Sequence, residues 1–256
     1  MNDSNEFWFE HAGVRLYVRE LGSGAPLVFL HGGFADHRAS LLRVGALAAQ
    51  ARVIAPDLRG SGRSVYRGEL SWDLLADDVR ALLDALGLER AVIGGTSAGS
   101  AVALRFALRH PERTRGALLM APIYPGTALG LSEAQRAAMD AMHEAGSRTV
   151  REGMDALRPL FERLPDAIRA RALEMTRSFD PGSVAATTGF LASGAQPFDE
   201  LTELGAIDAP VLIVPGTDLE HPAELAALYA QHLPRSVLVA ADAVDLVQRM
   251  AELVRG

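Results

Sequence analysis

Short, wholly hydrophobic runs alternate with helical patterns over the first half of the chain. Such uninterrupted runs are expected of strands that are buried on both faces of a parallel sheet. Between them, hydrophobic residues recur at helical spacing, and in one segment Ser71 suits the N-cap position while Gly87 ends the helix. The strands predicted here are residues 26–30, 52–55, 91–94 and 117–120, and the helices are residues 37–50, 71–86 and 98–110.

The pattern changes after residue 124. Residues 131–195 have helical periodicity throughout, and strand–helix alternation returns only near residue 211. We therefore predict an α/β fold with a mostly parallel sheet and helices on both faces, formed by residues 1–124 and 196–256 and interrupted by a helical insertion at 125–195. The further predicted strands are 7–9, 14–18, 211–214 and 237–239, and the further helices are 132–145, 149–164, 165–179, 181–193, 223–232 and 242–254.

Composition and charge narrow the class of protein. The chain has 256 residues, 49% hydrophobic and 22% charged, with a formal net charge of −7, which is typical of a globular protein with a sizeable core. The acidic balance argues against nucleic acid or an anionic membrane as a partner, because both need a basic patch. No apolar run of about 18 residues and no secretory signal is visible, so we expect a cytoplasmic protein, either a monomer or a homodimer.

The absence of two residue types excludes further chemistry. The chain has no cysteine, which excludes disulfides, a thiol nucleophile and cysteine-based metal sites. All of its basic side chains except histidine are arginine, so Schiff-base chemistry on lysine is excluded as well. Neither metal-ligand spacing nor a glycine-rich phosphate loop stands out, and no metal or cofactor is expected. The lysine-free, Ala/Arg-rich composition suggests a GC-rich bacterial source.

The main candidate for chemistry is Ser97. It lies in Gly95-Thr96-Ser97-Ala98-Gly99, between a predicted strand and a predicted helix. This G-x-S-x-G pattern in this context is typical of a serine held on a sharp turn for nucleophilic attack. The helix that follows presents its N-terminus, which favours negative charge, to the same place.

The sequence resembles the α/β-hydrolase family. Besides the serine turn, several segments are similar to family motifs and follow one another in the family's order. They are His31-Gly32-Gly33-Phe34, similar to the His-Gly oxyanion loop; Asp57–Ser64, similar to D-x-R-G-x-G-x-S; residues 76–88; His110–Arg113; and residues 118–122.

The resemblance implies roles for particular residues. Ser97 would be the nucleophile, and the N–H of Ala98 with that of Gly33 or Phe34 would form the oxyanion hole. Asp218 would be the acid, because residues 214–222 resemble the family's G-x-x-D-x-x-x-P pattern with one residue missing before the acid. The helical insertion would be a cap over the active site.

The family's base is missing from its usual place. The resemblance implies a histidine after the last strand, but no histidine follows His232. The alternatives are His221, three residues after Asp218, and His37, where the oxyanion loop becomes a helix. His143 in the predicted cap is a third candidate. Losing the histidine from such a triad costs on the order of 10⁶-fold in kcat. Whether another histidine replaces it therefore determines whether Ser97 can act as a nucleophile.

Three functions are therefore compatible with the sequence. The first is an enzyme that uses Ser97 to attack an ester, thioester, lactone or activated C–C bond of an apolar small molecule, assisted by Asp218 and a relocated histidine. The second is a non-hydrolytic cyclase, lyase or isomerase of secondary metabolism with a degenerate triad. The third is a non-catalytic ligand-binding member of the same fold.

Overall fold

The computed structural model describes residues 4–162, 164 and 166–256. The chain forms one 8-stranded sheet with the strand order β1-β2-β4-β3-β5-β6-β7-β8. β1 and β2 are antiparallel to their neighbours, and from β4 through β8 every adjacent pair is parallel. The predicted fold class is thus confirmed. The strands are β1 (Ser4–His11), β2 (Val14–Leu21), β3 (Pro26–Leu30), β4 (Arg52–Pro56), β5 (Ala91–Thr96), β6 (Thr114–Met120), β7 (Val211–Val214) and β8 (Ser236–Leu238).

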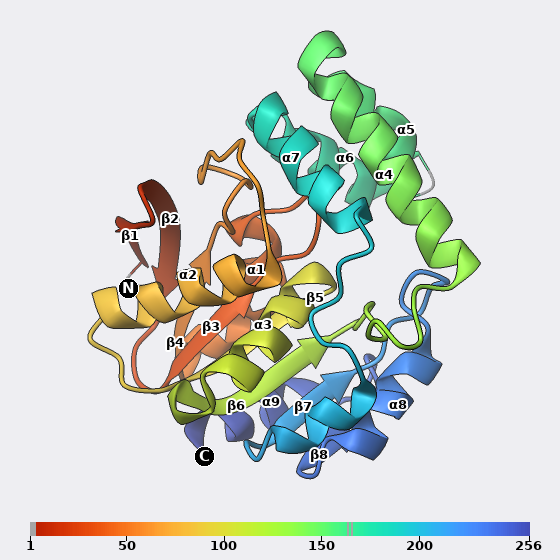
Figure 1. The fold of residues 1–256 in the computed structure, drawn as a ribbon. Coiled ribbons are helices and arrows are strands. Elements are labelled where there is room, and N and C mark those ends of the chain that lie inside the picture. Colours follow the sequence, from red (N-terminus) through yellow and green to blue (C-terminus); the bar gives the residue numbers. More distant parts are fainter. Residues whose placement is uncertain (1–3, 163, 165) are drawn as a thin grey trace.

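Helices cover both faces of this sheet (Figure 1). Alternate residues of the central strands point to opposite faces. Ile93 of β5 packs in one hydrophobic cluster with residues of α2, α3 and α8, whereas its neighbour Val92 packs in another with residues of α1 and α9. The uninterrupted hydrophobic runs in the sequence follow from this double burial. The helices involved are α1 (His37–Val44), α2 (Trp72–Ala85), α3 (Ala98–Arg109), α8 (Ala223–His232) and α9 (Leu246–Arg255).

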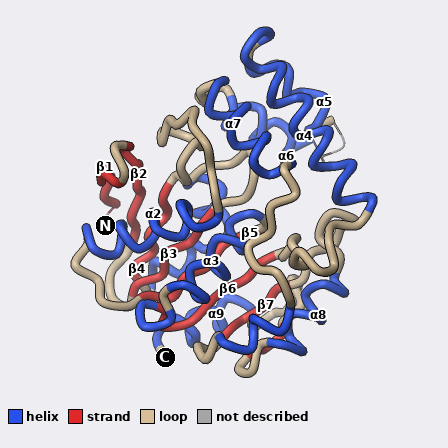
Figure 2. The backbone as a smooth tube through the Cα atoms, in the orientation of Figure 1, coloured by secondary structure: helices blue, strands red, loops and turns tan. Residues whose placement is uncertain are grey.

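A second helical layer lies over one end of the sheet (Figure 1). It is inserted between β6 and β7, and loops at 121–132 and 193–200 connect it to the core (Figure 2). The layer has its own hydrophobic cluster, which includes Leu157, Phe161 and Phe179. We keep the term cap for residues 125–195 as a prediction of their role. The helices of the layer are α4 (Glu133–Glu152), α5 (Arg158–Phe161), α6 (Asp166–Thr176) and α7 (Pro181–Ala192).

The helix predicted at 149–164 is wrong as a single element. α4 runs on to Glu152 and ends at Gly153, whose φ of 76° is a conformation that favours glycine. A short 3₁₀ turn (Met154–Leu157) and α5 follow. Hydrophobic periodicity continues across this break because both sides pack into the same cluster. The predicted start of the next helix, residue 165, lies outside the described residues.

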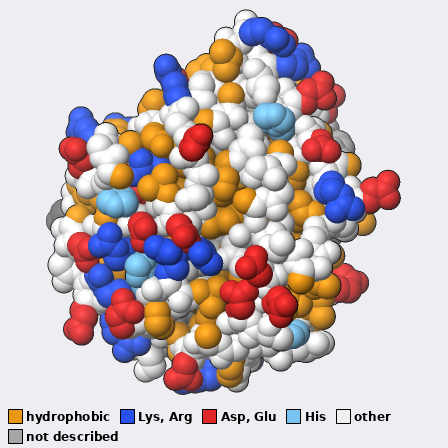
Figure 3. Space-filling view, in the orientation of Figure 1, with side chains coloured by type: hydrophobic (Ala, Val, Ile, Leu, Met, Phe, Trp, Pro, Cys, Tyr) orange, Lys and Arg blue, Asp and Glu red, His pale blue; other side chains and the backbone are white. Residues whose placement is uncertain are grey.

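Hydrophobic and charged side chains are unevenly distributed over the surface. On the face drawn in Figure 3, hydrophobic side chains gather across the middle, while charged side chains cluster over the region of α2 and α3. Ion pairs between these two helices, such as Arg105 with Asp73 and Arg109 with Asp77, account for that cluster. In the described residues, no helix is both long enough and apolar enough to cross a bilayer.

Candidate active site

Ser97 lies on a strained turn between β5 and α3. Its φ of 54° and ψ of −120° are unusual for a residue with a side chain, and such a conformation costs about 1–3 kcal/mol. The flanking glycines make the turn possible. A Cβ on Gly95 would lie 2.3 Å from the carbonyl carbon of Gly99, and a Cβ on Gly99 would lie 2.4 Å from the carbonyl oxygen of Leu30. The G-x-S-x-G spacing therefore reflects close backbone packing, and the turn raises Ser97 at the carboxyl end of β5.

His221 lies next to Ser97. Its Nε2 is 2.9 Å from the Ser97 Oγ, and its Nδ1 is 2.8 Å from Oδ1 of Asp218. A carboxylate only accepts hydrogen bonds, so Nδ1 carries the proton and Nε2 presents its lone pair to the serine hydroxyl. This is the tautomer that a general base needs. Of the histidines considered from the sequence, the structure brings His221 to the serine.

The loop between β7 and α8 holds Asp218 and His221 together. Oδ1 of Asp218 also accepts the backbone N–H of His221 at 2.8 Å and that of Glu220 at 3.0 Å. These bonds close a tight local turn of the kind that aspartate favours. Burial opposes ionisation of the carboxyl, but the neighbouring His221 ring and these N–H donors outweigh it and hold the pKa of Asp218 below its usual value.

Gly216 gives this loop the space to fold back. A Cβ added there would lie 2.2 Å from Cβ of His221 and 2.3 Å from its carbonyl oxygen. A real side chain would therefore displace His221 from the position it has beside Ser97. The sequence marks this glycine as part of the family-like motif, but the contact with His221 is visible only in the fold.

The loop after β3 lies against the serine. A Cβ on Gly32 would be 3.3 Å from Cβ of Ser97, and Phe34 has a φ of 52°. In the described part of the chain, the N–H groups of Gly33 and Phe34 donate no backbone hydrogen bond outside the regular elements. Ala98 is the first residue of α3, and the first N–H groups of a helix have no partner within it. The predicted oxyanion donors thus lie on two elements that meet at Ser97.

His31 braces this loop. Its Nε2 accepts the N–H of Leu58 at 3.0 Å, and its Nδ1 is 2.8 Å from the carbonyl oxygen of Gly32. Burial lowers the pKa of His31, which keeps the ring neutral and consistent with one donating and one accepting nitrogen. Both ring nitrogens are engaged, as expected of a structural histidine.

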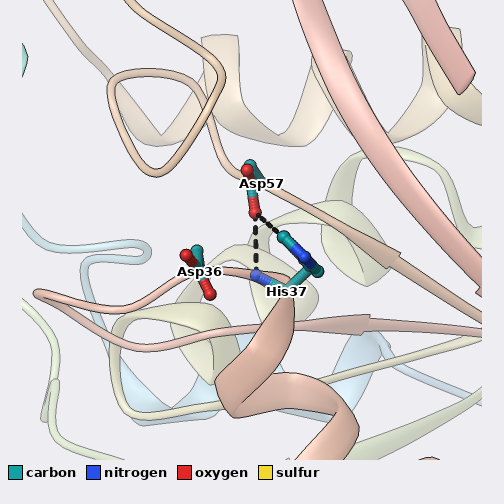
Figure 4. Close-up of side chains that lie close together, drawn as sticks. All are labelled: Asp36, His37 and Asp57. Atoms are coloured by element: carbon teal, nitrogen blue, oxygen red, sulfur yellow. Dashed lines mark hydrogen bonds and ion pairs between the residues drawn. The ribbon is translucent and has the colours of Figure 1, made fainter. Parts of the chain in front are cut away.

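The structure places His37 elsewhere. Its Nδ1 lies 2.7 Å from Oδ1 of the buried Asp57, which also accepts the His37 backbone N–H at 2.8 Å (Figure 4). His37 is not among the residues that line the cavity beside Ser97. The first turn of α1 is pinned to the Asp57 loop instead, so the ring does not reach the position that a base would occupy.

Among the residues that the structure describes, two groups of side chains are close enough together to be considered as metal ligands. Asp36, His37 and Asp57 form one, and Asp218, Glu220 and His221 form the other. In the first group, Asp36 accepts hydrogen bonds from the Arg38 guanidinium, and Asp57 accepts those from His37. In the second, the imidazole bridges a carboxylate and Ser97. Hydrogen bonds account for both arrangements.

A cavity of about 870 Å³ opens beside Ser97 and His221. Its wall is largely hydrophobic, and the helices α4 to α7 supply part of it, including Met139, Met142 and Leu191. Side chains of the helical insertion therefore line the cavity that opens beside the serine. A mostly apolar cavity with a few polar groups at one point is typical of a small-molecule site.

Gln135 supports the site in a way that the sequence does not reveal. Its Nε2 donates to the carbonyl oxygens of Ile123 at 2.7 Å and Glu220 at 3.1 Å. One buried side chain of α4 thus ties the loop after β6 to the loop that carries Asp218 and His221. Ser132 and Gln135 also form a capping box at the start of this helix.

Known proteins share this architecture. A family model described as alpha/beta hydrolase fold matches residues 25–179. The chain is 39% identical over 117 residues to the 2-hydroxymuconate semialdehyde hydrolase of Pseudomonas sp. (strain CF600), a match that covers 43% of this chain and 40% of that enzyme. The curated match therefore concerns less than half of that relative's length.

Two solved structures cover nearly the whole chain. A thermophilic esterase from Thermogutta terrifontis has a TM-score of 0.77 and 26% identity, covering 98% of this chain and 97% of that one. Est816, described as an N-acyl homoserine lactone degrading enzyme, has a TM-score of 0.73 and 30% identity, covering 98% of this chain and 99% of that one. Together with the family model and the serine turn, these matches lead to one conclusion: the chain belongs to the α/β-hydrolase family.

Proposed function

We propose that this protein is a serine hydrolase in which Ser97 is the nucleophile, His221 the general base and Asp218 the acid that orients it. The observation that carries the proposal is the continuous chain of hydrogen bonds from Ser97 Oγ to His221 Nε2 at 2.9 Å and from His221 Nδ1 to Asp218 at 2.8 Å. The base missing after the last strand is thereby supplied by the loop after β7.

The reaction would follow from these contacts in two halves. Oγ of Ser97 attacks the substrate carbonyl carbon while its proton passes to Nε2 of His221. The tetrahedral intermediate collapses, and the imidazolium returns that proton to the leaving alcohol, so an acyl-enzyme remains. Water then attacks the acyl carbon, gives its proton to His221 and releases the acid, and the serine regains its proton.

The negative charge that forms on the carbonyl oxygen needs donors that are already in place. The N–H of Ala98 at the start of α3 and that of Gly33 or Phe34 would supply them. The strained backbone of Ser97 fits this role, because it brings Oγ and the first N–H groups of the helix to the same side of the turn.

The substrate would be a small ester, thioester or lactone with an apolar body. The cavity supports this size and polarity, since about 870 Å³ lies beside the serine and its wall is largely hydrophobic. The relatives point in the same direction, because one is named an esterase and another a lactone-degrading enzyme.

A fluorophosphonate probe tests the nucleophile. We expect a single adduct on the intact protein at neutral pH, its loss in Ser97→Ala, and labelling slowed by orders of magnitude in His221→Gln. Hydrolysis of p-nitrophenyl butyrate should follow the same order. Folded wild-type protein that forms no adduct and hydrolyses no ester would contradict the proposal and favour a non-hydrolytic enzyme or a binding protein.

A further inference from the structure

Among the described residues, two exposed arginines line the cavity of the candidate site. Arg43 lies in the last turn of α1 and Arg171 lies on α6, and both border the cavity that holds Ser97. The two helices pack against each other, since the Arg38 guanidinium on α1 donates to the carbonyl oxygen of Met175 on α6 at 2.9 Å. Arg43 and Arg171 are therefore exposed residues on two contacting helices, and both lie at the rim of the same cavity.

Their lack of partners sets them apart from neighbouring arginines. On or next to the same helices, Arg38 pairs with Asp36, Arg169 with Asp166 and Arg177 with Glu174. In the described part of the chain, no carboxylate forms an ion pair with Arg43 or Arg171, although the protein as a whole carries an excess of acidic residues. Guanidinium groups match carboxylates in geometry and charge, so two that lack a carboxylate partner are available to bind an anion.

The wall between the two ends is apolar. Leu42 is next to Arg43 in the sequence, and Ile168 lies one helical turn before Arg171. Both are exposed, and both also line the cavity. The acidic side chains among the lining residues, Asp218 and Glu220, belong to the loop that carries His221. The cavity thus has an acid–base end, a hydrophobic wall and a cationic rim.

We propose that the substrate carries a carboxylate at the end remote from its scissile bond, and that Arg43 and Arg171 bind this group at the cavity rim. The proposal rests on the function proposed above and narrows its substrate class from apolar esters to esters or lactones with an anionic tail. An apolar segment would span the wall, and the carboxylate would determine which end of the molecule reaches Ser97.

Matched substrates test the proposal. One series pairs p-nitrophenyl monoesters of dicarboxylic acids with methyl-terminated p-nitrophenyl esters of equal chain length. A second series places the carboxylate in the alcohol, comparing acetoxy carboxylic acids with alkyl acetates. We expect kcat/KM to favour the carboxylate-terminated member in at least one series. The preference should fall about fivefold in Arg43→Met and in Arg171→Met, mainly through KM, and further in the double variant.

The control is Arg151→Met, which removes the same charge from an exposed site on α4 that does not line the cavity. It should leave the preference unchanged, whereas about 1 M salt should reduce the wild-type preference by screening. If the wild type hydrolyses both members of both series equally well, the carboxylate site is wrong while the serine hydrolase stands.

A binding measurement separates the two proposals. Calorimetric titration of Ser97→Ala with a carboxylate-terminated ester needs no turnover. If the wild type is inactive on all esters, binding that weakens in the arginine double variant would still support the site. If the ester binds neither to Ser97→Ala nor to the same protein with both arginines replaced, the carboxylate site is overturned.

Discussion

Among the histidine–aspartate pairs of the described residues, two have nearly equal lengths and very different surroundings. His37 and Asp57 lie 2.7 Å apart, with the aspartate side chain 0% exposed, and His221 and Asp218 lie 2.8 Å apart, with the aspartate 60% exposed. The short distance does not separate a structural pair from the pair that we propose to be catalytic. The two histidines differ in the surroundings of the ring. Nε2 of His221 faces Ser97, whereas the ring of His37 packs against that of Tyr17, with the two ring centroids 4.9 Å apart.

The partners of the two carboxylates differ in a related way. Asp57 joins residues from separate parts of the chain, accepting the N–H groups of both His37 and Arg63. Asp218 accepts only from its own loop among the hydrogen bonds of the described residues. The first pair holds loops together, and we infer that the second holds one imidazole at a fixed angle. The following changes should separate these roles.

The largest contrast is expected between the two histidines. His221→Gln should lower kcat on the order of 10⁴-fold or more, because it removes the base that we propose for Ser97. His37→Gln should leave kcat within about threefold and lower the free energy of unfolding by about 1–3 kcal/mol, because the buried Asp57 loses a donor. Steady-state kinetics and urea unfolding measure the two effects. Equal losses of kcat in both folded variants would remove the distinction.

The next effect concerns Gly216. Gly216→Ala places a methyl group 2.2 Å from Cβ of His221, so the loop must shift and kcat should fall about 10²-fold. The control is Gly205→Ala, where the nearest atom to the new methyl group is the His232 carbonyl oxygen at 3.8 Å. Wild-type kcat in Gly216→Ala would show that the position of His221 does not depend on this close contact.

A smaller loss is expected at Gln135. Gln135→Met removes the bonds to the carbonyl oxygens of Ile123 and Glu220, and kcat should fall about three- to tenfold with little change in KM. Ser132→Ala is the matched control, because it breaks the capping box of the same helix but leaves the bond to the Glu220 carbonyl. If the two variants lose kcat equally, Gln135 acts only through helix stability.

The smallest effect is on the pH dependence of stability. The hydrogen bonds from His37 and Arg63 outweigh burial and hold the pKa of Asp57 below its ordinary value. A lowered folded-state pKa stabilises the protein above the unfolded-state value of about 3.9, and that contribution is lost as pH falls below it. In Asp57→Asn, the midpoint of urea unfolding should therefore fall less steeply as the pH is lowered to about 3. Asp218→Asn should reduce this steepness less, since the exposed carboxylate is screened by water. A midpoint that falls more steeply with decreasing pH in Asp57→Asn than in the wild type would contradict the stabilising contribution of ionised Asp57.

Much of the fold could be predicted because its signals are local. The central strands are continuous hydrophobic runs, and Gly95 and Gly99 on either side of Ser97 indicate the tight turn. The choice between His37 and His221 could not be made in this way, because both follow strand ends near motif residues. The choice depends on how residues 216–221 fold back, and on the contact between His221 and Ser97, which are 124 positions apart in the sequence. The unpaired state of Arg43 and Arg171 likewise requires knowing where every nearby carboxylate points.

The β7–α8 loop also has a consequence for how this protein can change in evolution. If acid and base both lie within residues 218–221, one short exchange of coding sequence can replace or transplant them together. The segment between β8 and α9, which carries no reacting group in this arrangement, is then free to accept insertions, deletions or a fused domain without touching the chemistry. The hydrolase proposed here would tolerate remodelling at a place where an enzyme with its base after the last strand would not.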